Sequence, residues 1–130
     1  MKNKLWITLM ISSVLILGGC KLAPVHNVEN AAISATMKTL SADQISEAIV
    51  RAGSGLGWKM HPDVDAKEVI GVLTLRKHMA KVRVNYTDEF YSIKYVDSQN
   101  LKYDGENIHN NYNGWIQNLD RAIQTQLNLL

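Results

Sequence analysis

Residues 69 to 97 contain three successive stretches with the two-residue period of β-strands, and this pattern constrains the fold more than any other feature. The stretches are VIGVLTLR at 69–76, AKVRVNYT at 80–87 and FYSIKYVD at 90–97. The first stretch is apolar at nearly every position, and the second alternates apolar and polar residues cleanly, as a strand with one buried face requires. Because the connectors KHM and DE are short, neighbouring strands should pair antiparallel. The sequence therefore predicts a meander.

A helix is predicted before this meander. Ser41 and Gln44 have the spacing of a capping box, in which each side chain hydrogen-bonds the backbone amide of the other residue. Apolar residues at helical spacing then predict a helix over 42–52 that stops at Gly53, followed by a strand over 56–61. The glycines of GSGLGWKM follow a helix, whereas a dinucleotide-binding loop precedes one, so they are interpreted as turn residues.

A last helix is predicted after the meander, over about residues 112–128. Its buried stripe should consist of Trp115, Leu119, Ala122, Ile123 and Leu130. A short first strand is also expected at 30–36. One antiparallel sheet of four to five strands with both helices on one face would bury all these apolar stripes. The expected fold class is therefore α+β, a two-layer sandwich.

The first twenty residues have a different composition. Lys2 and Lys4 precede the uncharged run LWITLMISSVLIL at 5–17, which ends at Gly18 and Gly19. This order of basic, apolar and small residues is typical of a secretory signal peptide. A membrane-spanning helix is the alternative, but it needs about 20 apolar residues, and this run is shorter.

Cys20 is the only cysteine of the chain, and Leu17-Gly18-Gly19-Cys20 resembles a bacterial lipobox. In that signal the thiol receives a diacylglyceryl group, the preceding peptide is removed, and the new amino terminus is acylated, usually with palmitate. The resemblance implies a signal peptide at 1–19, a lipidated tether at 20–29 and a single periplasmic domain at 30–130. Such lipoproteins often stay at the inner membrane when aspartate follows the cysteine. Lys21 stands there instead, so we expect the outer membrane, with the domain facing the periplasm.

Charge and residue usage exclude several functions. The 14 basic and 12 acidic residues of the chain become 12 and 12 without Lys2 and Lys4, so nucleic-acid binding is not implied. A lipidated cysteine leaves no thiol for a disulfide or a zinc site. The chain has four histidines, His26, His61, His78 and His109. Their spacing is not that of metal ligands. No cofactor, metal site or catalytic constellation is expected.

The strand phases predict one candidate interaction surface. If Val82 and Val84 face the helices, Lys81, Arg83 and Lys94 lie on the opposite face of the sheet, with Arg76 and Lys59 nearby. Most acidic residues are expected in the connectors. A basic face on a membrane-anchored domain could contact anionic lipid headgroups, an anionic envelope polymer or an envelope protein. The alternative is an ordinary solvated face.

A second candidate surface is the loop in YDGENIHNNYNGWIQNLDRAI, residues 103–123. Asp104, His109, Asn111 and Trp115 could form a polar and aromatic site for cell-wall sugars or peptides, or a hydrolase site. The alternative is a loop whose side chains cap the last helix and stabilise turns. Together with RAGSGLGWKM at 51–60, this segment resembles a group of small proteobacterial lipoproteins without an assigned activity. That resemblance implies only the lipoprotein class and no functional residue. Because no catalytic constellation is present in the sequence, we expect a non-enzymatic binding or assembly module.

Overall fold

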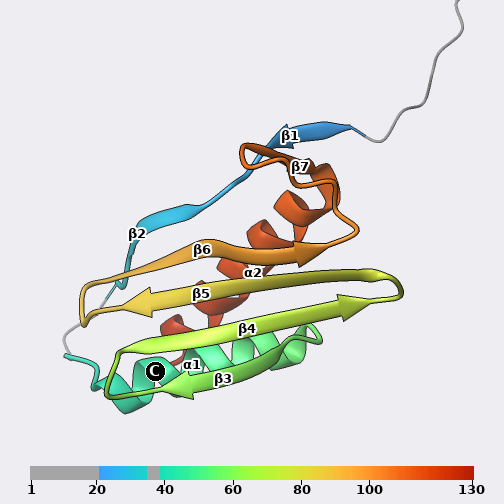
Figure 1. The fold of residues 1–130 in the computed structure, drawn as a ribbon. Helices are drawn as coiled ribbons and strands as arrows, with labels where there is room; N and C mark the ends of the chain where they lie inside the picture. Colours follow the sequence, from blue (N-terminus) through green and yellow to red (C-terminus); the bar gives the residue numbers. More distant parts are fainter. Residues whose placement is uncertain (1–20, 35–38) are drawn as a thin grey trace, which may run out of the picture.

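A computed structural model describes residues 21–34 and 39–130 of the chain. The predicted signal peptide at 1–19 and the predicted lipidation site Cys20 lie outside the described residues. The elements in chain order are β1 (Leu22–Pro24), β2 (Val28–Ala32), α1 (Ala42–Gly55), β3 (Lys59–Asp63), β4 (Glu68–Leu75), β5 (His78–Tyr86), β6 (Phe90–Gln99), β7 (Asn107–His109) and α2 (Asn110–Asn128) (Figure 1).

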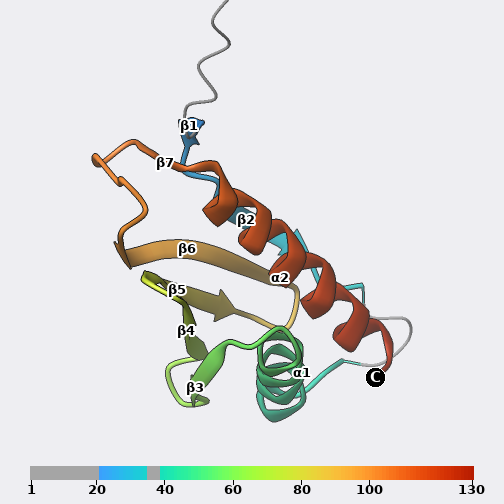
Figure 2. The same cartoon turned by 90° about the vertical axis from the view of Figure 1, so that its right-hand side faces the viewer.

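The predicted α+β fold is confirmed. Five strands form an antiparallel sheet in the order β2-β6-β5-β4-β3, and β1 pairs with β7 in a small second sheet. Both helices cover the same face of the large sheet and leave its other face open (Figure 2). The core lies between these two layers.

The predicted meander corresponds to β4, β5 and β6, which pair in sequence order. Val82 and Val84 of β5 are fully buried, and Tyr86 is 4% exposed, whereas Arg83 between them is exposed. On β6, Tyr91 and Ile93 are likewise buried. The alternation in the sequence therefore identified the covered face correctly, because successive side chains of a strand point to opposite sides.

Helix α1 begins as predicted and ends later than predicted. The capping box is present, with the Gln44 amide donating to Ser41 Oγ at 3.2 Å and the Ser41 amide donating to Gln44 Oε1 at 2.9 Å. Gly53, however, is a buried residue within the helix. A Cβ at this position would lie 2.3 Å from Met60 Sδ, so the glycine permits close packing of β3 rather than ending the helix. In the segment that follows α1, the glycine with left-handed backbone is Gly57, at φ +88°.

Helix α2 begins two residues before the predicted start, and its buried stripe differs in part. Leu119 and Ile123 are fully buried as expected, but Leu130 is 43% exposed because the helix ends at Asn128. Tyr112 and Ile116, which the predicted stripe omitted, are also fully buried.

The expectation of a tether up to residue 29 is wrong for the described residues. Leu22–Pro24 forms β1, which pairs with β7, and β2 already begins at Val28. The strand predicted at 30–36 is therefore β2 at Val28–Ala32, and residues 35 and 36 lie outside the described residues. The partners of these two strands follow 58 to 87 residues later in the chain, so no pattern within the segment itself indicated the pairing.

Within residues 21–34 and 39–130, neither helix has the length and apolar composition that a membrane crossing requires.

Candidate functional site

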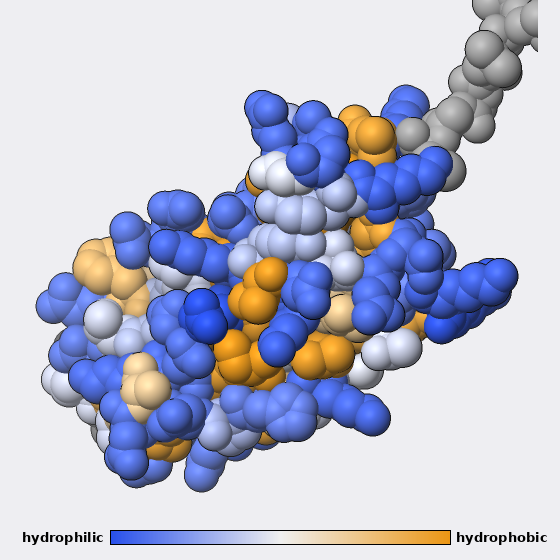
Figure 3. Space-filling model, viewed as in Figure 1, coloured by the Kyte–Doolittle hydropathy of each residue, from blue (hydrophilic) through white to orange (hydrophobic). Residues whose placement is uncertain are grey.

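The sheet surface that the helices leave uncovered, called the open face below, is the first candidate site. Figure 3 views the molecule from this side and shows apolar side chains gathered near the middle, with hydrophilic ones around them. The strand pairing determines which residues are neighbours there, since residues opposite each other on paired strands point to the same side. Its central residues are Lys59, His61, Ile70, Val72, Lys81, Arg83 and Lys94.

The register places the predicted basic residues around two apolar ones. Arg83 lies between Ile70 on one side and Lys94 on the other, and Lys81 lies beside Val72. Ile70 and Val72 are only partly buried, because no helix covers this face. The structure thus brings Lys81, Arg83 and Lys94 together as predicted.

The expectation that most acidic residues lie in the connectors is wrong at this face, where two acidic residues lie on strands. Glu68 is the first residue of β4, and its Oε2 lies 2.9 Å from Arg83 Nε and accepts a hydrogen bond from Asn85 at 3.2 Å. Asp97 lies opposite Lys81 because a register shift after Lys81 brings it there. The face is therefore less basic than the sequence indicated, and Arg83 is already paired.

The remaining cations are Lys59, Lys81 and Lys94. None of the three forms an ion pair within 4.0 Å in the described part of the chain, where the pairs are Arg83 with Glu68 and Arg51 with Glu47. Arg76 does not belong to this face, since it lies in the turn between β4 and β5 with φ at +56°. The open face therefore presents unpaired lysines beside an apolar centre.

Ile70 and Val72 were missing from the predicted surface, although the sequence carried a signal for them. The segment VIGVLTLR is apolar at nearly every position, whereas a strand with one solvated face alternates. A continuous apolar run in an antiparallel strand indicates apolar residues on both faces, and β4 has them.

The second predicted site, residues 104–114, includes β7 and the start of α2, and its polar side chains hydrogen-bond its own backbone. Asp104 Oδ1 accepts hydrogen bonds from the amides of Asn107 at 2.7 Å and Glu106 at 2.9 Å. These two bonds, that from Asn107 first, lower the pKa of the Asp104 carboxyl below its usual range. His109 caps α2, its Nδ1 accepting from the Asn111 amide at 3.1 Å.

Trp115 does not join these groups in a common cavity. It lines a small depression of about 90 Å³ with mostly apolar residues, and neither Asp104 nor His109 lines it. The other residues of that lining are Leu56, Trp58, Leu73, Leu75 and Asn118. The arrangement fits the capping and turn roles better than a shared sugar or peptide site.

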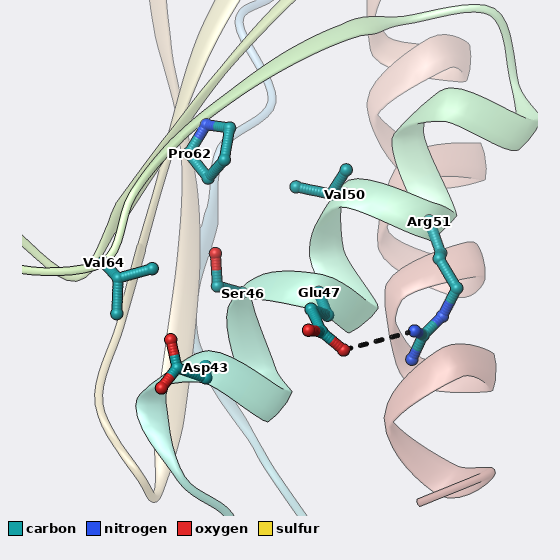
Figure 4. A pocket seen from close by; sticks show the side chains of 7 residues that line it. All are labelled: Asp43, Ser46, Glu47, Val50, Arg51, Pro62 and Val64. Carbon is teal, nitrogen blue, oxygen red and sulfur yellow. Dashed lines mark ion pairs between the residues drawn. The ribbon is translucent and has the colours of Figure 1, made fainter.

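A larger hollow of about 330 Å³ lies between α1 and β3 (Figure 4). Val50, Pro62 and Val64 give it an apolar lining. Of the charged residues that line it, Glu47 lies 3.7 Å from Arg51. Carboxylates and one hydroxyl without an imidazole or thiol offer no nucleophile–base pair. Of the two sides of this hollow, the apolar periodicity of the sequence predicted only the helix α1.

The four histidines have different surroundings. His61 lies on the open face, and His78 Nδ1 is 2.9 Å from the carbonyl oxygen of Asn100. His26 donates its backbone amide to Asn113 Oδ1 at 2.9 Å. Among the described residues, no group of three or more histidine, cysteine or acidic side chains is close enough to hold a metal ion.

Comparisons of the chain with models of protein families, with curated proteins and with solved structures gave no match.

Proposed function

We propose that the chain is a lipid-anchored, non-enzymatic binding module of the bacterial envelope, which holds an envelope component on the open face of its sheet. One observation supports this proposal above the others. The open face is uncovered, and it combines the partly exposed Ile70 and Val72 with lysines that have no ion-pair partner among the described residues.

The chemistry of this face favours an anionic partner with an apolar part. Lys81 and Lys94 can approach a negative group without first breaking an ion pair, while Ile70 and Val72 provide apolar area. Burial of apolar area contributes about 25 cal/mol per Å² to binding before the costs of association. An acidic envelope protein or an acylated anionic polymer would have both features.

The anchor rests on the resemblance of residues 17–20 to a lipobox. Each buried methylene contributes about 0.8 kcal/mol to membrane binding, so two acyl chains hold a protein stably on a bilayer. Growth of the expressing bacterium with labelled palmitate should label the protein, and Cys20→Ala should abolish both the label and the membrane fractionation. An unlabelled wild-type protein would refute the anchor.

The binding face is tested by pull-down from envelope extracts. Lys81→Glu/Lys94→Glu should lose the partners that the wild-type protein captures, since both lysines lie on the open face and neither forms an ion pair among the described residues. Arg83 is left unchanged because its loss would leave Glu68 without its ion-pair partner.

A matched control reverses two charges at positions outside the open face. Arg76→Glu/Lys77→Glu lies in the turn between β4 and β5 and should leave partner capture unchanged. Equal capture by all three proteins would remove the open face from the proposal, and equal loss in both variants would show only a nonspecific charge effect.

A further inference from the structure

The first described residues are fixed to the body of the domain. Leu22, Ala23 and Pro24 pair with His109, Ile108 and Asn107. The Asn110 amide donates to the Lys21 carbonyl at 3.0 Å, and the Val25 amide donates to the Glu106 carbonyl at 3.0 Å.

Asn113 secures the same segment from α2. Its Oδ1 accepts from the His26 amide at 2.9 Å, and its Nδ2 donates to the Pro24 carbonyl at 2.9 Å. Asn113 is 8% exposed, so these bonds are sheltered from water. Residue 21 is therefore attached directly to the folded domain, without a flexible linker between them.

This attachment limits how far the domain can stand from a lipid on Cys20, and here the inference rests on the proposed function. Consecutive Cα atoms are about 3.8 Å apart, so the Cα of Leu22 lies within about 7.6 Å of the Cα of Cys20. The headgroup region on each side of a bilayer is about 5–7 Å thick. The end of the domain that carries β1 must therefore reach the headgroups.

Residues 101–106 lie beside β7 on the side opposite β1. The His109 amide donates to the Leu101 carbonyl at 2.8 Å, and the Asp104 amide donates to the Asn107 carbonyl at 3.2 Å. Figures 1 and 2 both place β1 and β7 at one extremity of the domain, with the C terminus at the opposite side. Residues 21–24 and 101–109 are called the β1–β7 end below.

The side chains at the β1–β7 end suit a membrane interface. Leu22 is 48% exposed and Tyr103 is 41% exposed. The Tyr103 ring lies 4.2 Å from the ring of Tyr95, centroid to centroid, so it is supported from behind. Tyrosine is enriched where headgroups meet acyl chains, and lysine reaches from there to the phosphates. Lys21 and Lys102 supply the lysines and Asp104 and Glu106 the acids, so these charges cancel.

We propose that the β1–β7 end is a membrane-contacting surface, in which Leu22 and Tyr103 enter the interfacial region of the bilayer that holds the acyl chains. The surface is neutral in sum, so the contact depends on apolar burial rather than on anionic lipid. The large sheet then extends away from the bilayer, and its open face points sideways to a partner instead of lying on headgroups.

The single cysteine provides a direct test. With Cys20 acylated, an introduced cysteine is the only free thiol of the protein. Leu22→Cys and Tyr103→Cys place a thiol at the β1–β7 end, and Asp88→Cys places the matched control in the turn between β5 and β6. The full-length lipoproteins are labelled with an environment-sensitive fluorophore and reconstituted into phosphatidylethanolamine–phosphatidylglycerol vesicles that contain a headgroup nitroxide.

Quenching should be several-fold stronger at positions 22 and 103 than at 88. It should persist in about 1 M salt, where the Debye length is only about 3 Å. Equal quenching at all three positions in palmitate-labelled protein would overturn the orientation while leaving the anchor intact. Loss of the contact in salt would overturn its apolar character. Protein without palmitate would refute the anchor and, with it, this inference.

Discussion

The two faces of the large sheet are built from the same strands, but the helices cover only one of them. On the covered face, Val69, Val82 and Val84 are fully buried beneath the helices. On the open face, their neighbours Ile70 and Arg83 remain in contact with solvent. One strand thus contributes buried side chains to the core on one face and residues of the proposed binding surface on the other, so substitutions on the two faces should have separable effects.

The largest effect is expected where the helix layer meets the covered face. Leu119 of α2 is fully buried, and Leu119→Ala should lower the free energy of unfolding by about 2–5 kcal/mol, through lost burial and the cavity that remains. Urea denaturation measures the change. A loss below about 1 kcal/mol, typical of a surface site, would contradict the two-layer core.

A matched pair of valines compares the faces directly. Val82 of β5 is fully buried on the covered face, whereas Val72 of β4 is partly exposed on the open one. Val82→Ala removes two buried methyl groups and should cost about 2 kcal/mol. Val72→Ala should cost less than about 1 kcal/mol, mostly from β-propensity. Equal losses in denaturation would mean that the open face is covered after all.

Alkaline pH should weaken the covered side, because Tyr112 of α2 is fully buried there, with its ring centroid 5.7 Å from that of Tyr95 in β6. Burial raises the pKa of Tyr112 above its usual value. Above pH 10 the unfolded chain loses this proton while the folded chain keeps it, so stability falls as pH rises, by about 1.4 kcal/mol per pH unit for one group.

Tyr112→Phe should therefore flatten the decline in stability above pH 10, measured by urea denaturation at a series of pH values. Tyr91, whose pKa is also raised mainly by burial and then by its hydrogen bond to Asp120, sustains part of the decline in that variant. A double Tyr91→Phe/Tyr112→Phe protein with the wild-type slope would show that these phenols are not the cause.

The smallest effect on stability is expected on the open face. Lys81→Gln/Lys94→Gln should change the free energy of unfolding by no more than about 0.5 kcal/mol, as is usual for surface sites without specific partners. Partner capture should nevertheless fall. A large change in stability would mean that these lysines hold the sheet together, and the separation between the faces would fail.

Several features of the fold were predictable because they are encoded by neighbours in the chain. The alternation around Val82 and Val84 gave the correct face of β5, and the Ser41–Gln44 capping box gave the start of α1. Both signals involve residues within a few positions of each other, so local stereochemistry is enough to generate them.

The candidate site was predictable only in part. Strand phase grouped Lys81 with Arg83 on one face, but the pairing of Arg83 with Glu68 depends on the register between β4 and β5. The position of Asp97 opposite Lys81 depends on a register shift in β6. Which charges neutralise each other across strands depends on the register of the pairing. The two-residue period of a single strand does not reveal that register.

By itself, the sequence determined the fold class, the covered face of the central strands and the capped start of α1. Only the tertiary structure decided that residues 22–24 form β1, that Gly53 lies inside α1, and which lysines of the open face stay unpaired. The first group follows from residues close in sequence, whose geometry the backbone fixes. The second group depends on contacts that only folding creates. Strand β7 pairs with β1 from far along the chain, and Met60 of β3 packs against Gly53 of α1.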